Sequence, residues 1–361
     1  MKISYLVLCF ISSSIRITSI SLIENDSQLE LFSFKELFLE DGEEMLKKLL
    51  LTLALAGVIV LSLSVGTAAF SVEQFLVGSN TDRLILLSSR LPRTVTVLLA
   101  GAGLSLSGLI MQSLTQNRFA APDTVGTVDA ARVGMLCGMI LFPGLSVVGK
   151  MALSFFFAAA GTFLFLVVVN RLPFKSQMTI PLLGLMYGNI LGGIANFFAF
   201  RFNVTQNLSA WMQGDFSLVI KGQYEGMYLI FLLFLALYFF ADHFTIARFG
   251  KDAAKNLGLP FEAVLFIGTL FVSLTVAVIL STVGNLPFLG VIIPNLVSLR
   301  FGDNIRNTHG KVALFGAVFL LLCDIFSRAV IPPYEIPVET VLGVFGGGLF
   351  LWLLLKGGRT A

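Results

Sequence analysis

Residues 91–114 read LPRTVTVLLAGAGLSLSGLIMQSL, and no charged side chain follows Arg93 within them. A helix needs about 20 apolar residues to cross the hydrocarbon core of a bilayer. This stretch is therefore long enough for one membrane-spanning helix. Its small residues Gly101, Ser105 and Gly108 recur at helical spacing, and small residues in such a row let membrane helices pack closely.

Windows of similar length and hydropathy recur along the rest of the chain. They lie near residues 46–68, 122–142, 148–170, 179–201, 224–242, 263–282, 308–331 and 335–355. A shorter window, 287–298, is interrupted by Pro287, Gly290 and Pro294. It is too short to span a bilayer upright, so we expect a half-length or tilted helix buried among the others. The sequence thus predicts an all-α integral membrane protein with about ten transmembrane helices.

The composition of the 361-residue chain also indicates a membrane protein. Hydrophobic residues make up 56% of it and charged residues 12%, with a mean hydropathy of +0.90. Soluble domains carry about 25% charged residues, and a soluble fold of this size cannot hide so much apolar surface from water. An ordinary cytosolic enzyme, a disordered chain and a nucleic-acid-binding protein are therefore excluded.

Few side chains are suited to chemistry or metal binding. The two histidines, His243 and His309, lie far apart in polar connectors. The cysteines Cys9, Cys137 and Cys323 show no paired spacing. These patterns are unlike a zinc, haem or thiolate site or a histidine acid–base pair. We expect no catalytic residue, no metal site and no cofactor.

The first 44 residues differ in charge from the rest. They hold eight of the 21 acidic residues but three of the 24 basic ones, whereas residues 45–361 carry a net charge of +8. Residues 45–66, MLKKLLLTLALAGVIVLSLSVG, are typical of a first membrane helix anchored in the cytoplasm by lysines. We expect residues 1–44 to be a dispensable extension or a misassigned start, and residues 45–361 to form the membrane domain. The distribution of basic residues favours both ends of this domain in the cytoplasm.

Charged pairs within the predicted helices are few. Asp129 and Arg132 are three residues apart on one helix. Asp324 and Arg328 are four apart on another, so each pair can meet on one helix face. We interpret both as structural pairs, with a functional role as the alternative. No chain of carboxylates or histidines crosses the membrane, which argues against a proton-coupled secondary transporter.

Three arginines fall at helix ends on the predicted external side, where the positive-inside bias disfavours them. They are Arg90 and Arg93 in the sequence RLPR, and Arg328. One interpretation is that their long side chains reach from the membrane to its surface. The other is a docking surface for carboxylates of a soluble partner, because guanidinium groups match carboxylate geometry.

The connector between the predicted sixth and seventh helices reads GKDAAKNLGLP from residue 250. Asp252 suits the start of a helix and Gly258 its end. The apolar residues that share one face are Ala253, Ala254 and Leu257. We expect a short amphipathic helix at the membrane surface, which is either a simple linker or a segment that seats in a groove of a cytosolic partner.

Several stretches resemble, in the same order, the FecCD permease family, the membrane subunits of iron-siderophore and vitamin B12 type (BtuC-type) ABC importers. The similarity extends from about Met45 to Lys356. The matching stretches are RLPRTVTVLLAGAGLSLSGLIMQSLTQNRFAAPDTVG (90–126), WMQGDF (211–216), GKDAAKNLG (250–258), GNLPFLGVIIPNLVSLRFGDN (284–304) and CDIFSRAVIPPYEIPVETVLGVFGGGLFLWLLLK (323–356).

The resemblance implies a permease of about ten helices that works as a pair over two cytosolic ATP-binding subunits and performs no chemistry itself. The second permease subunit would be identical or paralogous. An extracytoplasmic substrate-binding protein would deliver a ferric siderophore. The chain would lie in the cytoplasmic membrane of a bacterium, surrounded by lipid.

The resemblance also implies roles for particular residues. The arginines that meet acidic groups of the binding protein match Arg90, Arg93 and Arg328. The main contact with the ATPase falls on Gly250, Lys251, Asp252, Ala253, Ala254, Leu257 and Gly258. The translocation path runs between two permease subunits, close to the broken helix that holds Pro287, Gly290, Pro294 and Asn295.

Three motifs depart from the family pattern, one of them the G-A-P near the last helix, which reads GGG at residues 346–348. The family's N-P-L-A-x-P reads N-R-F-A-A-P at residues 117–122, and the histidine of its P-H-x-x-R is replaced by Asn295. Asn295 and the run PYEIP at residues 333–337 resemble a branch linked to catecholate-type ferric siderophores. An ion- or proton-coupled secondary transporter is the alternative class.

Overall fold

The computed structural model describes residues 53, 55–66, 80–171 and 179–357. The chain divides into two units, residues 1–54 and 55–361, and the second unit forms the helical bundle. The predicted extension, residues 1–44, lies outside the described residues. Within the described ranges all regular structure is helical, apart from one isolated β-bridge between Ile331 and Tyr334. The predicted all-α class is therefore confirmed.

The helices follow one another with short connections. In chain order they are Leu55–Ser64, α4 (Asn80–Ile85), the π-helix η1 (Leu86–Arg90), α5 (Leu91–Thr115), α6 (Thr127–Leu141), α7 (Val147–Asn170), α8 (Thr179–Arg201), α9 (Thr205–Met212), the 3₁₀ helix η2 (Glu225–Leu229), α10 (Ile230–Ala247), α11 (Lys251–Asn256), α12 (Phe261–Val283), α13 (Leu289–Phe301), α14 (Ile305–Ala329) and α15 (Val338–Gly357). Pro92 lies where the π-helix η1 passes directly into α5 within one continuous helix, Arg83–Thr115, and a proline interrupts the regular hydrogen bonding of a helix at such a place.

Among the described residues, six stretches are long and apolar enough to cross a membrane. They are Arg83–Thr115, Val147–Asn170, Thr179–Arg201, Glu225–Ala247, Phe261–Val283 and Ile305–Ala329. Shorter apolar helices cover Leu55–Ser64, Leu289–Phe301 and Val338–Leu353. The multi-pass membrane architecture agrees with the sequence, and the total of about ten spans stays a prediction.

One predicted span is shorter in the structure, because the window 122–142 forms a helix only over Thr127–Leu141. Gly126 has a φ of 80°, in the left-handed region that favours glycine, so the chain turns there before α6 begins. Residues 117–126, called here the re-entrant segment, run back along α5. Two of them, Pro122 and Asp123, line a small cavity together with Leu104, halfway along that helix.

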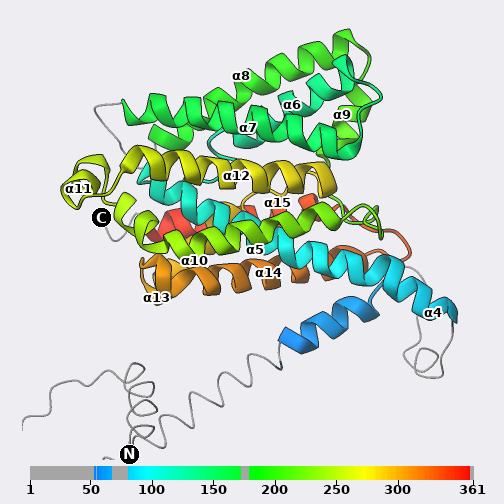
Figure 1. Ribbon diagram of the computed structural model, residues 1–361. Helices are drawn as coiled ribbons and strands as arrows, with labels where there is room; N and C mark the ends of the chain where they lie inside the picture. Colours follow the sequence, from blue (N-terminus) through cyan, green and yellow to red (C-terminus); the bar gives the residue numbers. More distant parts are fainter. Residues whose placement is uncertain (1–52, 54, 67–79, 172–178, 358–361) are drawn as a thin grey trace, which may run out of the picture. The chain divides into compact units, whose positions relative to one another are not determined.

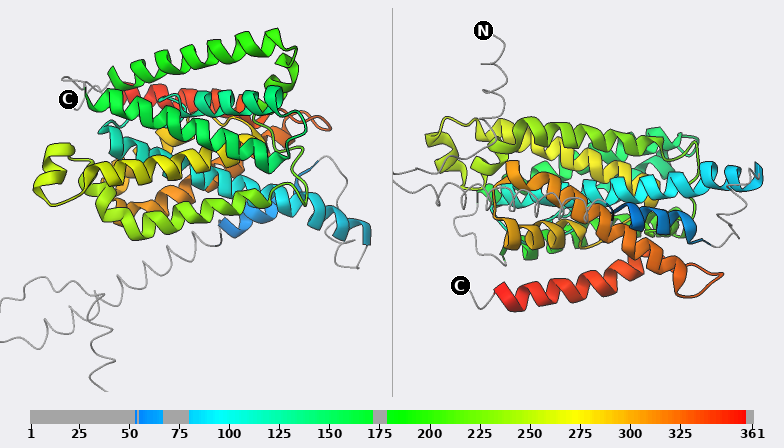
Figure 2. Two further views of the ribbon diagram at one scale, coloured as in Figure 1. Left: turned by 45° about the horizontal axis from the view of Figure 1, so that its top comes forward. Right: turned by 90° about the horizontal axis from the view of Figure 1, so that it is seen from below.

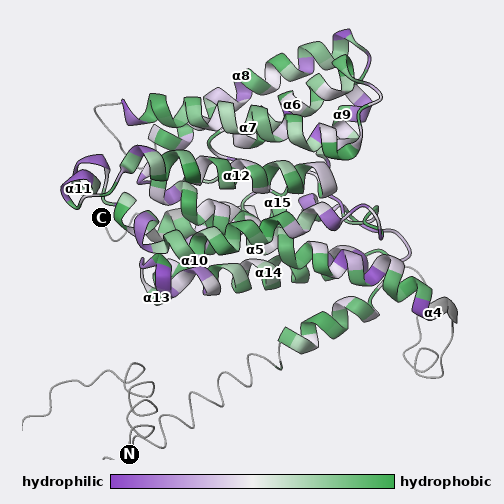
Figure 3. Ribbon diagram, in the orientation of Figure 1, coloured by the Kyte–Doolittle hydropathy of each residue, from purple (hydrophilic) through white to green (hydrophobic). Residues whose placement is uncertain are grey.

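The helices of residues 55–357 lie side by side, and α5 packs in their midst against α10, α12, α13 and α14 (Figure 1, Figure 2). The short helix α11 lies at one end of this bundle, and α4 lies at the opposite end (Figure 1). We call these the α11 end and the α4 end. Hydrophilic residues gather near both ends, and the helices between them are mostly apolar (Figure 3), as a membrane-spanning bundle requires.

Two neighbouring helices touch the backbone of α5. A side-chain carbon at Gly101 would overlap the carbonyl group of Gly316 in α14. A side-chain carbon at Gly108 would overlap the carbonyl group of Gly290 in α13. Ser105 lies between these contacts and donates to the carbonyl oxygen of Gly101 at 2.7 Å. The row of small residues predicted on this helix is therefore where its neighbours pack most closely.

The predicted pair, Asp129 and Arg132, lies on the side of α6 that faces α8. Arg132 donates to the Oδ1 atom of Asn196 at 2.5 Å. Gly188 makes room for the carboxylate of Asp129, because a side-chain carbon there would lie 2.5 Å from its Oδ2 atom. Arg132 thus joins α6 to α8, and both side chains lie against Gly192 of α8, where the charge of Arg132 still acts on Asp129.

Candidate functional site

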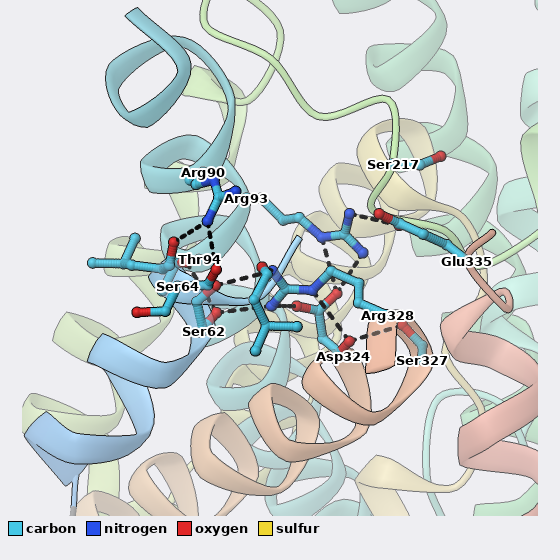
Figure 4. A network of polar contacts seen from close by, with 12 residues as sticks. Ser62, Ser64, Arg90, Arg93, Thr94, Ser217, Asp324, Ser327, Arg328 and Glu335 are labelled. Carbon is cyan, nitrogen blue, oxygen red and sulfur yellow. Dashed lines mark hydrogen bonds and ion pairs between the residues drawn. The ribbon is translucent and has the colours of Figure 1, made fainter. Parts of the chain in front are cut away.

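The three arginines predicted at helix ends come together at the α4 end of the bundle. Arg90 closes η1, Arg93 lies in the first turn of α5, and Arg328 lies in the last turn of α14. Their side chains gather around Asp324 and around the end of the helix Leu55–Ser64 (Figure 4). All three residues are buried, with exposed fractions of 5–8%.

Asp324 is the centre of this arginine cluster. Its Oδ1 atom accepts from Nε and Nη2 of Arg93 at 3.0 and 2.8 Å, and its Oδ2 atom accepts from Nη2 of Arg328 at 2.6 Å. The remaining Nη1 of Arg93 donates to Glu335 at 2.7 Å. One fully buried carboxylate therefore binds two guanidinium groups. The helical pair of Asp324 and Arg328 is as predicted, whereas the contact with Arg93 was not foreseen.

The arginines also bind the last carbonyl groups of the helix Leu55–Ser64. Arg90 donates to the carbonyl oxygen of Ser64 at 2.8 Å, and Arg328 donates to that of Ser62 at 2.9 Å. The final carbonyls of a helix have no partner within it and carry partial negative charge. Cationic side chains at this position therefore satisfy the helix end and tie it to η1 and α14.

These contacts give the arginines a structural role at the α4 end. Their donors are aimed at groups within the chain, among them Asp324 and Glu335. These arginine side chains do not extend to the membrane surface, because the residues are buried within the chain. Docking of a binding protein at these residues stays a prediction.

At the opposite end, the connector from residue 250 forms the short helix α11, Lys251–Asn256. Gly250 precedes it with a φ of 98°, and Gly258 follows it with a φ of 77°, so both turns use conformations that favour glycine. The predicted apolar face is divided. Ala254 is fully buried in the hydrophobic core of the chain, whereas Leu257 is 67% exposed. Leu257 is therefore an apolar side chain of the predicted face that a partner can reach.

The broken helix α13 is 13 residues long and contains Pro294. Its predicted start at Pro287 is wrong by two residues, because Phe288 takes a left-handed conformation with a φ of 70°. Asn295 is buried and donates from Nδ2 to the carbonyl oxygen of Val291 at 2.8 Å and to that of Arg118 at 2.7 Å. This residue therefore joins α13 to the first residues of the re-entrant segment.

Asp123 in the re-entrant segment is a functional candidate that the sequence reasoning missed. Its Oδ2 atom accepts from the backbone N–H of Phe288 at 3.0 Å, just before α13 begins. Carboxylates are favourable near helix N-termini because of the helix dipole. The signal available in the sequence was a carboxylate in a run otherwise lacking charge from residue 119 to 128. Among the described residues, no group of three or more His, Cys, Asp or Glu side chains could hold a metal ion.

Comparisons with known proteins agree on one family. The sequence model of the FecCD transport family matches residues 52–356. A petrobactin import system permease protein of Bacillus subtilis is 46% identical over 278 residues, which cover 77% of this chain and 88% of that protein. A ferric-anguibactin transport system permease protein of Vibrio anguillarum is 39% identical over 276 residues, covering 76% of this chain and 88% of that protein.

A solved structure also resembles the chain over most of its length. It is an inward-facing conformation of a metal-chelate type ABC transporter, with a TM-score of 0.71 and 25% sequence identity. The match covers 85% of this chain and 97% of that one. The likeness therefore extends across the helical bundle and is not confined to a few helices.

Replacing Asp324 by Ala tests the arginine cluster. The change leaves two buried guanidinium groups without their shared carboxylate, and breaking a buried pair from one side costs about 3–5 kcal/mol of stability. The control is Asp242→Ala, which breaks a pair with Arg306 whose side chains are 57% and 70% exposed and which should cost at most about 1 kcal/mol. The measurement is the unfolding midpoint of each purified protein in detergent. Equal losses of stability in the two variants would refute the structural role of the arginine cluster.

Proposed function

The chain belongs to the FecCD transport family, and we propose that it is the permease subunit of an ATP-driven ABC importer of ferric siderophores. The observation that carries this proposal is the match to two permeases, one named for petrobactin import and one for ferric-anguibactin transport, over about three quarters of the chain. The catecholate type of siderophore rests on Asn295 and on the run at residues 333–337. The chain itself performs no chemistry, and ATP is hydrolysed on separate subunits.

The α11 end is proposed to be the cytoplasmic side of the membrane. Leu257 is exposed there, beside a short helix with the position expected for an ATPase contact. α15 also finishes at this end (Figure 2), so the carboxyl end of the chain would be cytoplasmic. Two ATP-binding subunits would seat against α11 of this chain and of a second permease, and the translocation path would run between the permeases, near α13.

The α4 end would then face the binding protein. Arg90, Arg93 and Arg328 are proposed to lie beneath the docking surface, where they hold the helix ends in place and offer positive charge to acidic groups of the binding protein. Because their donors are engaged within the chain, docking at these residues requires that a partner carboxylate share or displace an internal acceptor. A binding protein would deliver the ferric siderophore at this surface.

A single-residue change in α11 tests the ATP-driven mechanism. Leu257→Asp places a charge on the exposed apolar residue and should abolish iron-limited growth on ferric siderophores in a strain that lacks the native permease. Asn256→Asp adds the same charge at the neighbouring exposed residue and is the matched control, which should retain growth. Membrane insertion of both variants is checked by immunoblot.

Two results would overturn the proposal. Growth of the Leu257→Asp strain equal to that of the wild type would rule out the ATPase contact at α11. Uptake that collapses with an uncoupler but continues without any ATP-binding subunit would instead indicate a secondary transporter. A panel of catecholate, hydroxamate and carboxylate siderophores in the same strain identifies the substrate class.

Docking is tested by charge reversal with rescue. Arg90→Glu should reduce uptake and binding-protein affinity at least about tenfold, because it places like charges against the partner's acidic groups. Reversing an acidic residue of the binding protein to Arg should restore uptake, since a purely internal role of Arg90 would not respond to the partner. Failure of every such reversal to rescue an inserted Arg90→Glu protein would contradict docking at this residue.

A further inference from the structure

A second cluster of charges surrounds Asp303, at the α11 end of the bundle. Asp303 lies in the turn between α13 and α14. Its Oδ2 atom accepts from Nη2 of Arg118 at 2.8 Å, and its Oδ1 atom lies 3.0 Å from Nη1 of Arg248. Ser298 donates a short hydrogen bond to the same carboxylate, and Arg248 also donates to the carbonyl oxygen of Asp303 at 3.1 Å.

The partners of Asp303 come from three different parts of the fold. Arg118 is the second residue of the re-entrant segment. Ser298 lies in α13. Arg248 follows α10 directly and stands two residues before Gly250, the residue that caps α11. One carboxylate therefore binds Arg248 just before α11, the broken helix and the re-entrant segment at the same time.

The re-entrant segment is fixed to α13 at two further points. Asn295 donates to the carbonyl oxygen of Arg118 at 2.7 Å, near the α11 end. Asp123 accepts from the backbone N–H of Phe288 at 3.0 Å, at the opposite end of α13. Between these points Gly290 faces Ala121, and a side-chain carbon at Gly290 would lie 3.0 Å from the Ala121 side chain. The segment and α13 are thus held together along their length.

The charges at Asp303 are maintained at physiological pH. Partial burial opposes ionisation of the carboxyl group, but the hydrogen bond from Ser298 and the charges of Arg248 and Arg118 outweigh it and hold the pKa of Asp303 below its ordinary value. Burial lowers the pKa of Arg248, and the charge of Asp303 opposes that shift. At any pH above this lowered pKa, the carboxyl group of Asp303 is mostly charged. Its contacts with Arg118 and Arg248 therefore persist until the medium becomes strongly acidic.

We propose that Asp303 is the positioning residue that transmits movement of α11 to the broken helix and the re-entrant segment during transport. The inference rests on the proposed function, since it assigns to α11 the contact with the ATP-binding subunits. Arg248 lies just before α11 and moves with it. The contacts of Arg248 with Asp303 then displace the turn that follows α13. The re-entrant segment follows because Arg118 and Asn295 join it to the same place.

A neighbouring ion pair at this end provides the matched control. Asp242 and Arg306 lie 2.8 Å apart and join α10 to α14, but neither contacts α13 or the re-entrant segment through this pair. The Asp242→Asn and Asp303→Asn variants remove the same charge from exposed or half-exposed positions of the same end. They differ in whether the removed charge joins α11 to the broken helix.

The experiment measures siderophore transported per ATP hydrolysed by the complete transporter in liposomes. Asp303→Asn should keep the rate of ATP hydrolysis and reduce the transport ratio by about three- to tenfold, the range of coupling that one residue commonly carries. Asp242→Asn should leave the ratio unchanged. If Asp303→Asn does not assemble, Arg118→Gln removes the link to the re-entrant segment from a side chain that is 54% exposed, and the same reduction is expected.

Each other outcome overturns the inference. An unchanged ratio in an assembled Asp303→Asn or Arg118→Gln transporter, or an equal fall in Asp242→Asn, would show that Asp303 transmits no movement. A proportional loss of ATP hydrolysis and transport, with a lower unfolding midpoint, would show a role in stability alone. Absence of ATP-dependent uptake by the wild-type transporter would instead contradict the proposed function.

Discussion

The fold depends on the contact between the backbones of α5, α13 and α14. Gly101 and Gly108 allow α14 and α13 to approach α5 so closely that a side-chain carbon at either residue would overlap a neighbouring carbonyl group. Within a membrane, helices gain little from burying apolar surface against one another, and close packing with hydrogen bonding holds them together. These glycines therefore set the distance at which the other contacts of the bundle can form.

Both charged clusters follow from this arrangement. Close packing of α14 along α5 brings Asp324 against Arg93 at the α4 end. At the α11 end, the turn that begins α14 brings Asp303 against Arg118, just beyond the end of α5. The first cluster is buried and holds helix ends in place, whereas the second is partly exposed and joins α11 to the broken helix. We therefore propose that the first cluster holds the helix ends beneath the docking surface and that the second transmits movement.

The sequence predicted the local features well, because hydropathy windows, turn glycines and helical spacing depend on nearby residues. The six long apolar helices, the short helix α11 and the contact of Asp324 with Arg328 are of this kind. The bond from Arg93 to Asp324 joins residues 231 positions apart, and only tertiary packing decides such a contact. The division of the α11 face into buried Ala254 and exposed Leu257 likewise depends on how the helix packs on the core, which periodicity does not specify.

The close approach of α13 to α5 is tested most directly by Gly108→Ala. The added carbon would meet a backbone carbonyl group, which cannot move aside as a flexible side chain can. Overpacking of this kind costs roughly 1–3 kcal/mol of stability. We therefore expect a lower unfolding midpoint in detergent and loss of siderophore uptake. Gly310→Ala is the control, because Gly310 lies in α14 with no atom within 4 Å of an added carbon, and it should leave both unchanged. Equal midpoints and equal uptake in the two variants would contradict the account.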